Sequence, residues 1–180
     1  AKGIHFVDSG NYHYMSLLWL KKVHTPFRLL VFDNHTDMQP PAFGGLLSCG
    51  GWAAEALKAL PFLKELILVG PDRNACEQTE EEIRNKVRFL SRESLREMTE
   101  QHKKTFFEEI SNDLPLYISV DKDVLRPGDA VTAWSQGDMK VQELEAALRA
   151  VCRHQSPAGM DVCGECDAGE DGICNDRVNG

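Results

Sequence analysis

The chain has 180 residues, of which 42% are hydrophobic and 27% are charged, and its formal net charge is −8. This length fits one domain with a substantial core. The acidic balance argues against a nucleic-acid surface and is compatible with a small cationic substrate, and the sequence has neither an apolar run of membrane length nor a signal peptide. Because the chain opens at Ala1 and soon reaches a strand-like segment, we expect a leading portion of the natural protein to lie outside it.

Six cysteines could form three disulfides, but a chain of this size does not need them to fold. We therefore expect reduced thiols and a cytoplasmic protein. Cys163 and Cys166, followed by Cys174, resemble part of a zinc knuckle, with His154 as a conceivable fourth ligand. Since no better fourth ligand is evident, a structural zinc is not favoured, and Cys163 and Cys166 are interpreted as thiols at the end of a strand.

Apolar runs that suit buried strands alternate with segments of helical periodicity along most of the chain. The expected strands cover residues 3–8, 28–32, 65–69, 87–90, 115–120 and 158–163. The expected helices cover residues 13–23, 52–60, 77–85, 91–110 (with a break near Gln101) and 141–151. This alternation predicts an α/β protein with three layers (α/β/α) and a mostly parallel sheet. Residues 1–166 form a single metal-binding domain in this interpretation, and residues 167–180 an irregular tail.

Residue types that bind metals follow three of the expected strands. The stretch Asp33-Asn34-His35-Thr36-Asp37, taken alone, fits a polar turn as well as a metal site. In a parallel sheet, however, the carboxyl ends of the strands share one edge, where ligands bind. The residues expected to converge there are His13, Asp33, His35, Asp37, Asp121 and Asp123. Four neighbouring carboxylates repel one another unless cations compensate, and two divalent ions balance their charge.

These stretches resemble the motifs of the arginase (ureohydrolase) superfamily. Asp33 to Asp37 is similar to its Asp-x-His-x-Asp motif, Ser119 to Leu125 to its second aspartate signature, and Gly10 to Tyr14 to the segment with its first histidine. The resemblance implies a divergent arginase-like protein in which the six residues above bind two Mn(II) ions or other divalent metals. It also implies hydrolysis of a linear C–N bond in a guanidino, amidino or related amide compound, by attack of a metal-bridging hydroxide.

The resemblance also implies roles for residues that do not bind metal. Asp37, besides being a ligand, would accept a hydrogen bond from the nucleophile and pass a proton to the leaving nitrogen. Glu165, one residue later than in the family pattern, would anchor the substrate. Gln39 and Ser48 fall where arginases hold the substrate amino acid, in a Pro- and Gly-rich loop (residues 39–51) that is long for a strand-to-helix connection.

Several departures from the family pattern separate this chain from the arginases. Residues 48–52 contain no histidine, although arginases carry a proton-shuttling histidine there, and Lys122 occupies a position that is usually small or hydrophobic. Arginine is therefore not favoured as the substrate. Two alternatives remain open: a deacetylase-like zinc amide hydrolase, whose usual paired histidines are absent, and a non-catalytic metal- or ligand-binding protein with this fold. A homo-oligomer is also compatible with the sequence.

Overall fold

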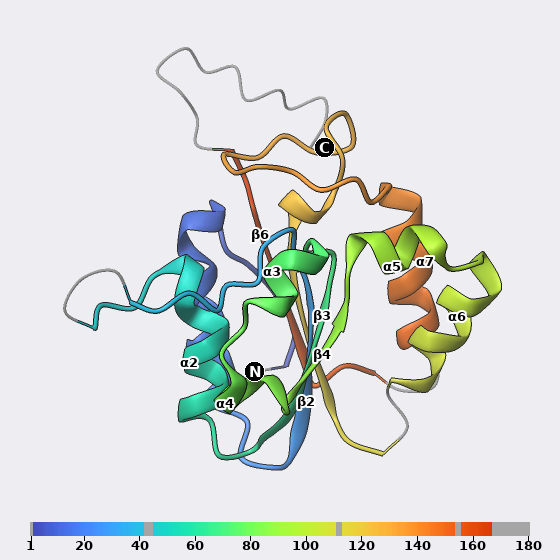
Figure 1. Ribbon diagram of the computed structural model, residues 1–180. Coiled ribbons are helices and arrows are strands. Elements are labelled where there is room, and N and C mark those ends of the chain that lie inside the picture. The colour runs from blue at the N-terminus through green and yellow to red at the C-terminus, as the bar shows by residue number, and fades with distance from the viewer. Residues whose placement is uncertain (1, 42–44, 111–112, 154–155, 167–180) are drawn as a thin grey trace.

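The computed structural model of the protein describes residues 2–41, 45–110, 113–153 and 156–166. Its centre is one sheet with helices on either side (Figure 1). The six strands of the sheet are parallel and have the order β1-β6-β5-β2-β3-β4. The strands are β1 (Ile4–Phe6), β2 (Phe27–Phe32), β3 (Leu63–Val69), β4 (Val87–Leu90), β5 (Leu116–Asp121) and β6 (Gly159–Cys163). The predicted irregular tail lies outside the described residues, as do His154 and Cys174 of the zinc knuckle that was not favoured.

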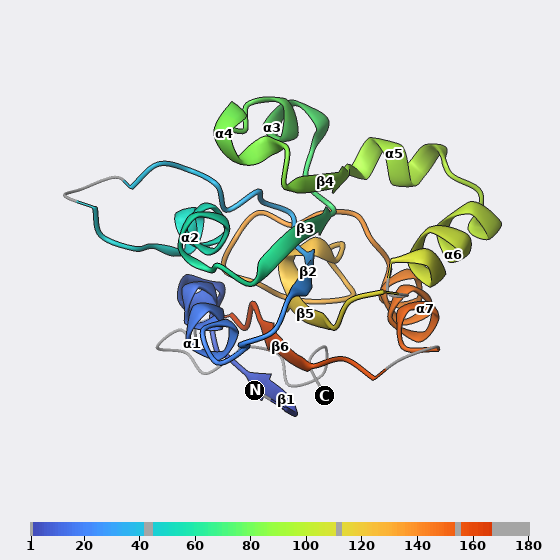
Figure 2. The same cartoon turned by 90° about the horizontal axis from the view of Figure 1, so that it is seen from below.

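Helices cover both faces of the sheet (Figure 2). One face carries α1 (Ser16–Leu20), α2 (Trp52–Ala59) and α4 (Glu81–Arg84), and the other carries α6 (Glu100–Glu109) and α7 (Val141–Val151). The remaining helices are α3 (Arg73–Glu77) and α5 (Arg92–Glu97), together with the short 3₁₀ segments η1 (Gly10–Met15), η2 (Cys49–Gly51) and η3 (Lys122–Val124). None of the helices in the described ranges is long and apolar enough to span a bilayer.

The strands are apolar on both faces because both faces are covered. In β2, Leu29 and Val31 pack into the core beneath α1 and α2, whereas Leu30 and Phe32 pack into the core beneath α6 and α7. Strands buried in this way have continuous apolar sequences rather than alternating ones. The structure thus confirms the predicted α/β/α layers, and the sheet is parallel throughout.

Two helix predictions were wrong in detail. Of the helix predicted over residues 77–85, only α4 (Glu81–Arg84) and the last residue of α3 are helical. The helix α3 begins earlier than predicted, because Asp72 caps it by accepting a hydrogen bond from the Ala75 amide at 2.9 Å. The helix predicted over residues 13–23 begins as η1 and ends at Leu20. The predicted break near Gln101 exists, since Thr99 caps α6 directly after α5 has ended at Glu97.

Candidate metal centre

Three neighbouring strands deliver potential ligands to the same level of the sheet edge. Phe32 of β2 pairs with Val120 of β5, so Asp33 and Asp121 are the next residues on these adjacent strands. Asp121 in turn is the register partner of Cys163, the last residue of β6. This parallel register places Asp33, Asp121 and Cys163 side by side, and all three are buried.

The first ligand group forms around His13, which η1 holds at the end of β6 and β5. Its Nδ1 atom lies 3.3 Å from Asp33 Oδ2, 3.4 Å from Asp37 Oδ2 and 3.5 Å from Asp121 Oδ2. One atom from each of His13, Asp33 and Asp37 falls within 4.8 Å of the others, close enough to share an ion. The imidazole thus faces three carboxylates from two adjacent strands.

The second ligand group forms around His35. Its Nδ1 atom lies 2.8 Å from Asp123 Oδ2 and 3.5 Å from Asp33 Oδ1. Asp33, His35 and Asp123 again offer three atoms within 4.8 Å of one another. Asp33 belongs to both groups, so two ions bound there would share it. The structure brings all six predicted ligands together, and their binding of metal remains a prediction.

Without a cation, the neighbouring carboxylates of this cluster repel one another. Burial, followed by the charges of Asp37 and Asp123, raises the pKa of Asp33 well above its usual range. Burial and Asp123 likewise raise the pKa of Asp121. Hydrogen bonds to Asp123 and Asp33 raise the pKa of His35 from 6.5 to about 11. Bound divalent ions would replace these protons and relieve the repulsion between the carboxylates.

A hydrogen-bonded chain outside the cluster orients His13. The Ser119 hydroxyl donates to Asp161 Oδ1 at 2.6 Å and lies 2.8 Å from His13 Nε2, so it accepts the Nε2 proton. Nδ1 is thereby turned toward the carboxylates, and within the part of the chain that the structure describes neither Nδ1 nor Asp33 Oδ2, both buried, makes a hydrogen bond. A histidine that binds metal directs one ring nitrogen at the ion while a partner holds the other ring nitrogen, so the donor set fits a cation.

Asp37 is held in a strained conformation by α2. Its φ of 51° lies in the left-handed region, which non-glycine residues seldom adopt. Its carbonyl accepts a hydrogen bond from the Ala53 amide at 3.0 Å, and its Oδ2 accepts one from Trp52 Nε1 at 2.7 Å. Burial and the Asp37 charge raise the pKa of the neighbouring Cys49 thiol, which therefore stays protonated at neutral pH. The N-terminus of α2 fixes one ligand of the first group.

The loop after β5 closes over the second group. Ser135 Oγ lies 2.9 Å from His35 Nε2, and its carbonyl accepts a hydrogen bond from Asn34 Nδ2 at 2.8 Å. Trp134 stands edge-on to the His35 ring, with 6.0 Å between the ring centroids. Contacts from this loop thus orient His35, as Ser119 orients His13.

The predicted substrate residues are less well assembled. Gln39 and Ser48 are exposed and line a cavity of about 210 Å³ beneath their loop, and none of the six predicted ligands is among its described lining residues. Glu165 lies at the end of β6, where its Oε1 atom is 2.5 Å from Lys122 Nζ. The Lys122 ammonium is therefore already paired with the Glu165 carboxylate, which was predicted to anchor a substrate cation. The roles of Gln39, Ser48 and Glu165 remain predictions.

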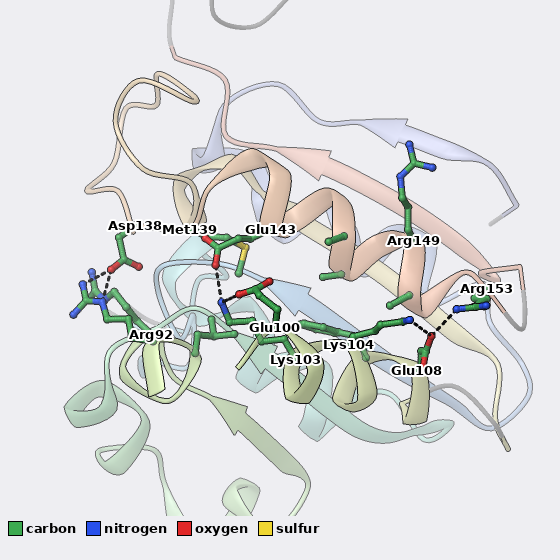
Figure 3. A pocket seen from close by; sticks show the side chains of 16 residues that line it. Arg92, Glu100, Lys103, Lys104, Glu108, Asp138, Met139, Glu143, Arg149 and Arg153 are labelled. Atoms are coloured by element: carbon green, nitrogen blue, oxygen red, sulfur yellow. Dashed lines mark hydrogen bonds and ion pairs between the residues drawn. The ribbon is translucent and has the colours of Figure 1, made fainter. Parts of the chain in front are cut away.

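A larger cavity, of about 550 Å³, lies between α5, α6 and α7 (Figure 3). Its charged side chains pair across the cavity, for example Lys103 with Glu143 at 2.7 Å and Arg153 with Glu108 at 3.1 Å. Within the described residues it contains none of the three-residue ligand groups. The candidate site is therefore the cluster at the strand ends.

Sequence reasoning did not assign functional positions to Ser119, Asp161, Trp52, Cys163 and Ser135. Asp161 offered a signal, because a carboxylate inside an apolar strand needs a buried partner. Ser119 opens the second aspartate signature and Cys163 belongs to a Cys-x2-Cys pair, but neither motif indicated the contacts that these residues make. Trp52 and Ser135 carry no comparable signal in their sequence neighbourhood.

Comparison with known proteins agrees with this geometry. The pattern of the arginase family matches residues 12–166. An uncharacterized protein of Thermotoga maritima is 32% identical over 168 residues, which cover 92% of this chain and 59% of that protein. The chain thus spans little more than half of this relative.

Solved structures share the fold at lower identity. The proclavaminate amidino hydrolase of Streptomyces clavuligerus is 21% identical with a TM-score of 0.73, over 89% of this chain and 54% of that one. The agmatine ureohydrolase of Thermoplasma volcanium is 16% identical with a TM-score of 0.74, over 94% and 56%. The arginase of Bacillus cereus is 19% identical with a TM-score of 0.68, over 88% and 62%. With the family pattern extending over most of its length, the chain belongs to the arginase family.

Proposed function

We propose that the chain carries the metal centre of a hydrolase that cleaves a linear, non-peptide C–N bond in a small guanidino, amidino or related amide compound. The observation that carries this proposal is the pair of ligand groups that share Asp33, one around His13 and one around His35. Two divalent ions held by these groups, Mn(II) or another divalent metal, would lower the pKa of bound water and so supply hydroxide near neutral pH.

The residues of the chain have separate tasks in this proposal. His13, held by Ser119, and His35, held by Ser135, keep their Nδ1 atoms directed at the carboxylates. Asp37 has one carboxylate oxygen bonded to Trp52, which leaves the other to accept a proton from the nucleophile. The Cys49 thiol, protonated beside Asp37, is a second group that can donate a proton to the leaving nitrogen in the absence of the shuttle histidine.

The ion pair between Lys122 and Glu165 limits the range of substrates that can bind at Glu165. A guanidinium that approaches Glu165 has to compete with the Lys122 ammonium, which already lies 2.5 Å away. A cationic substrate, whether guanidinium or amidinium, therefore binds only where its own contacts displace Lys122, whereas an uncharged amide meets no such competition. This contact also favours the second candidate, a binding protein of this fold without turnover, since it fills the anchor that a guanidino hydrolase needs.

Metal binding and turnover test the proposal together. The chain is stripped with chelator and titrated calorimetrically with Mn²⁺, and the loaded protein is assayed for ammonia, urea or amine release from a panel of guanidino, amidino and amide compounds. Two ions per chain and turnover of one panel member support the proposal. Bound metal with no turnover on the whole panel supports the binding protein instead. Failure to bind metal, with no difference between the chain and Asp121→Ala, overturns both.

A further inference from the structure

Cys163 lies in the candidate metal cluster, although neither the arginase-like motifs nor the proposed function uses it. It ends β6, is 1% exposed and is the register partner of Asp121. Its thiol donates to Asp121 Oδ2 at 3.2 Å. His13, Asp121 and Cys163 offer a nitrogen, an oxygen and a sulfur atom that all lie within 4.8 Å of one another. Ligand atoms around one small divalent ion are about 3 to 4 Å apart, so only a small adjustment separates this group from coordination.

A second observation points into the same space. Asp121 Oδ2, the oxygen that accepts from the thiol, also lies 3.5 Å from the buried Nδ1 atom of His13. Within the described residues that Nδ1 atom makes no hydrogen bond, and the contact between Ser119 and Nε2 keeps Nδ1 directed at Asp121. The sulfur therefore joins a nitrogen and an oxygen that are already directed at a common point.

We propose that Cys163 is a ligand of the metal ion bound by His13 and Asp121, and that its sulfur makes this position selective for zinc, cobalt or iron over manganese. The inference rests on the proposed metal centre and deepens it. On binding, the thiol releases one proton to solvent, the S–H bond is replaced by a sulfur–metal bond, and no electron is transferred. Thiolate sulfur prefers softer divalent ions, whereas carboxylate oxygens alone suit manganese.

The same arrangement gives the two metal positions different characters. The group around His35 contains two carboxylates and no sulfur among the described residues. The group around His13 can add Cys163 to its carboxylates. We expect the chain to take a softer ion beside His13 than beside His35, rather than two identical Mn(II) ions.

Cobalt absorption tests the inference with a readout that does not need activity. The chelator-stripped chain is titrated with Co²⁺ in oxygen-free buffer, and the near-ultraviolet sulfur-to-cobalt charge-transfer band is recorded beside the visible bands that report any bound Co²⁺. The chain should show both. Cys163→Ser should lose the charge-transfer band and keep the visible bands, and its preference for Zn²⁺ over Mn²⁺ in competition should fall at least roughly tenfold. Cys49→Ser, which removes the thiol beside Asp37, is the matched control and should keep both bands.

The outcomes separate the inference from the proposed function. Visible bands without a charge-transfer band in the unaltered chain overturn the inference and leave the metal centre standing. A charge-transfer band that Cys49→Ser removes and Cys163→Ser keeps also overturns it. Failure of the chain to bind Co²⁺, Zn²⁺ or Mn²⁺ overturns the inference together with the centre. Since the unaltered chain decides the first and last outcomes, a Cys163→Ser variant that fails to fold does not block the test.

Discussion

Asp33→Asn should have opposite effects on the metal-free and the metal-loaded protein. Asp33 is the one residue that belongs to both the His13 and the His35 ligand groups, and its oxygens fall within 4.8 Å of ligand atoms of Asp37 and Asp123. At an effective dielectric constant of about 20, each such carboxylate pair repels by roughly 3 kcal/mol. Burial adds to the cost of the Asp33 charge, and the hydrogen bonds to His13 and His35 offset part of the repulsion. The raised pKa of Asp33 indicates that burial and repulsion together outweigh these hydrogen bonds.

Asparagine removes the charge and keeps the shape. Its carbonyl can still accept the His35 amide, which now donates to Asp33 Oδ1 at 2.7 Å. Its amide can donate to His13 Nδ1, which lies 3.3 Å from Asp33 Oδ2. We therefore expect the metal-free variant to gain about 1 to 3 kcal/mol in free energy of unfolding. For a chain of this length that gain corresponds to a rise of roughly 3 to 10 °C in the unfolding midpoint.

Thermal unfolding followed by circular dichroism, with chelator and with saturating metal, measures both effects. Metal at a hundred times its Kd should stabilise the unaltered chain by about 2.7 kcal/mol and should leave Asp33→Asn almost unchanged. Asp8→Asn makes the same change of charge at an exposed aspartate and should respond to metal like the unaltered chain. A lower midpoint for metal-free Asp33→Asn, or an undiminished response to metal, would refute the reasoning that charge repulsion dominates this cluster.

Three further changes test the surroundings of the cluster. Lys122→Met removes the ammonium that pairs with Glu165 and should lower the KM for a guanidino substrate severalfold with little change in kcat. Steady-state kinetics measures both constants, and an unchanged KM argues against Glu165 as the anchor. Trp52→Phe removes the 2.7 Å hydrogen bond to Asp37 and should cost about 1.5 to 3 kcal/mol in urea unfolding, together with weaker metal binding; equal metal affinity would mean that Asp37 needs no support. Because the pKa of His35 is raised from 6.5 to about 11 in the folded metal-free protein, its contribution to stability is complete below pH 6.5 and is lost as the pH rises toward 11. Unfolding curves across this range should show the decline, and saturating metal, which needs a neutral His35, should abolish it and make stability fall instead as the pH drops below 6.5.

The clustering of the candidate metal ligands was predictable because most of them are close together in sequence. Asp33, His35 and Asp37 follow one strand, and Asp121 and Asp123 end another, so each strand brings its own group of ligands. Two non-local facts were also required: that β2 and β5 are neighbours, and that η1 places His13 beside Asp33 and Asp121. A parallel sheet, whose strand ends share one edge, made both a natural expectation.

The supporting residues were not predictable for the opposite reason. Ser119 meets Asp161, and Asp121 meets Cys163, only because β5 and β6 pair in one register. A shift of one residue would turn the other face of β6 toward the cluster and place Met160 or Val162 there. No local pattern fixes this register, so a cysteine at the end of a strand looked like an ordinary buried thiol.

The substrate half depends on the path of a long loop, and Asp37 is where that loop meets the metal centre. The loop leaves Asp37 at a φ of 51°, a conformation that costs about 1 kcal/mol or more in a non-glycine residue. It returns at Trp52 and Ala53, whose N–H groups bind the Asp37 carboxylate and carbonyl. The contacts that hold the strained ligand are therefore made by the residues that end the loop. A loop rebuilt for another substrate still has to come back to Asp37 with both donors in place, so if Asp37 binds metal as proposed, we expect changes in this loop to alter substrate specificity and metal affinity together.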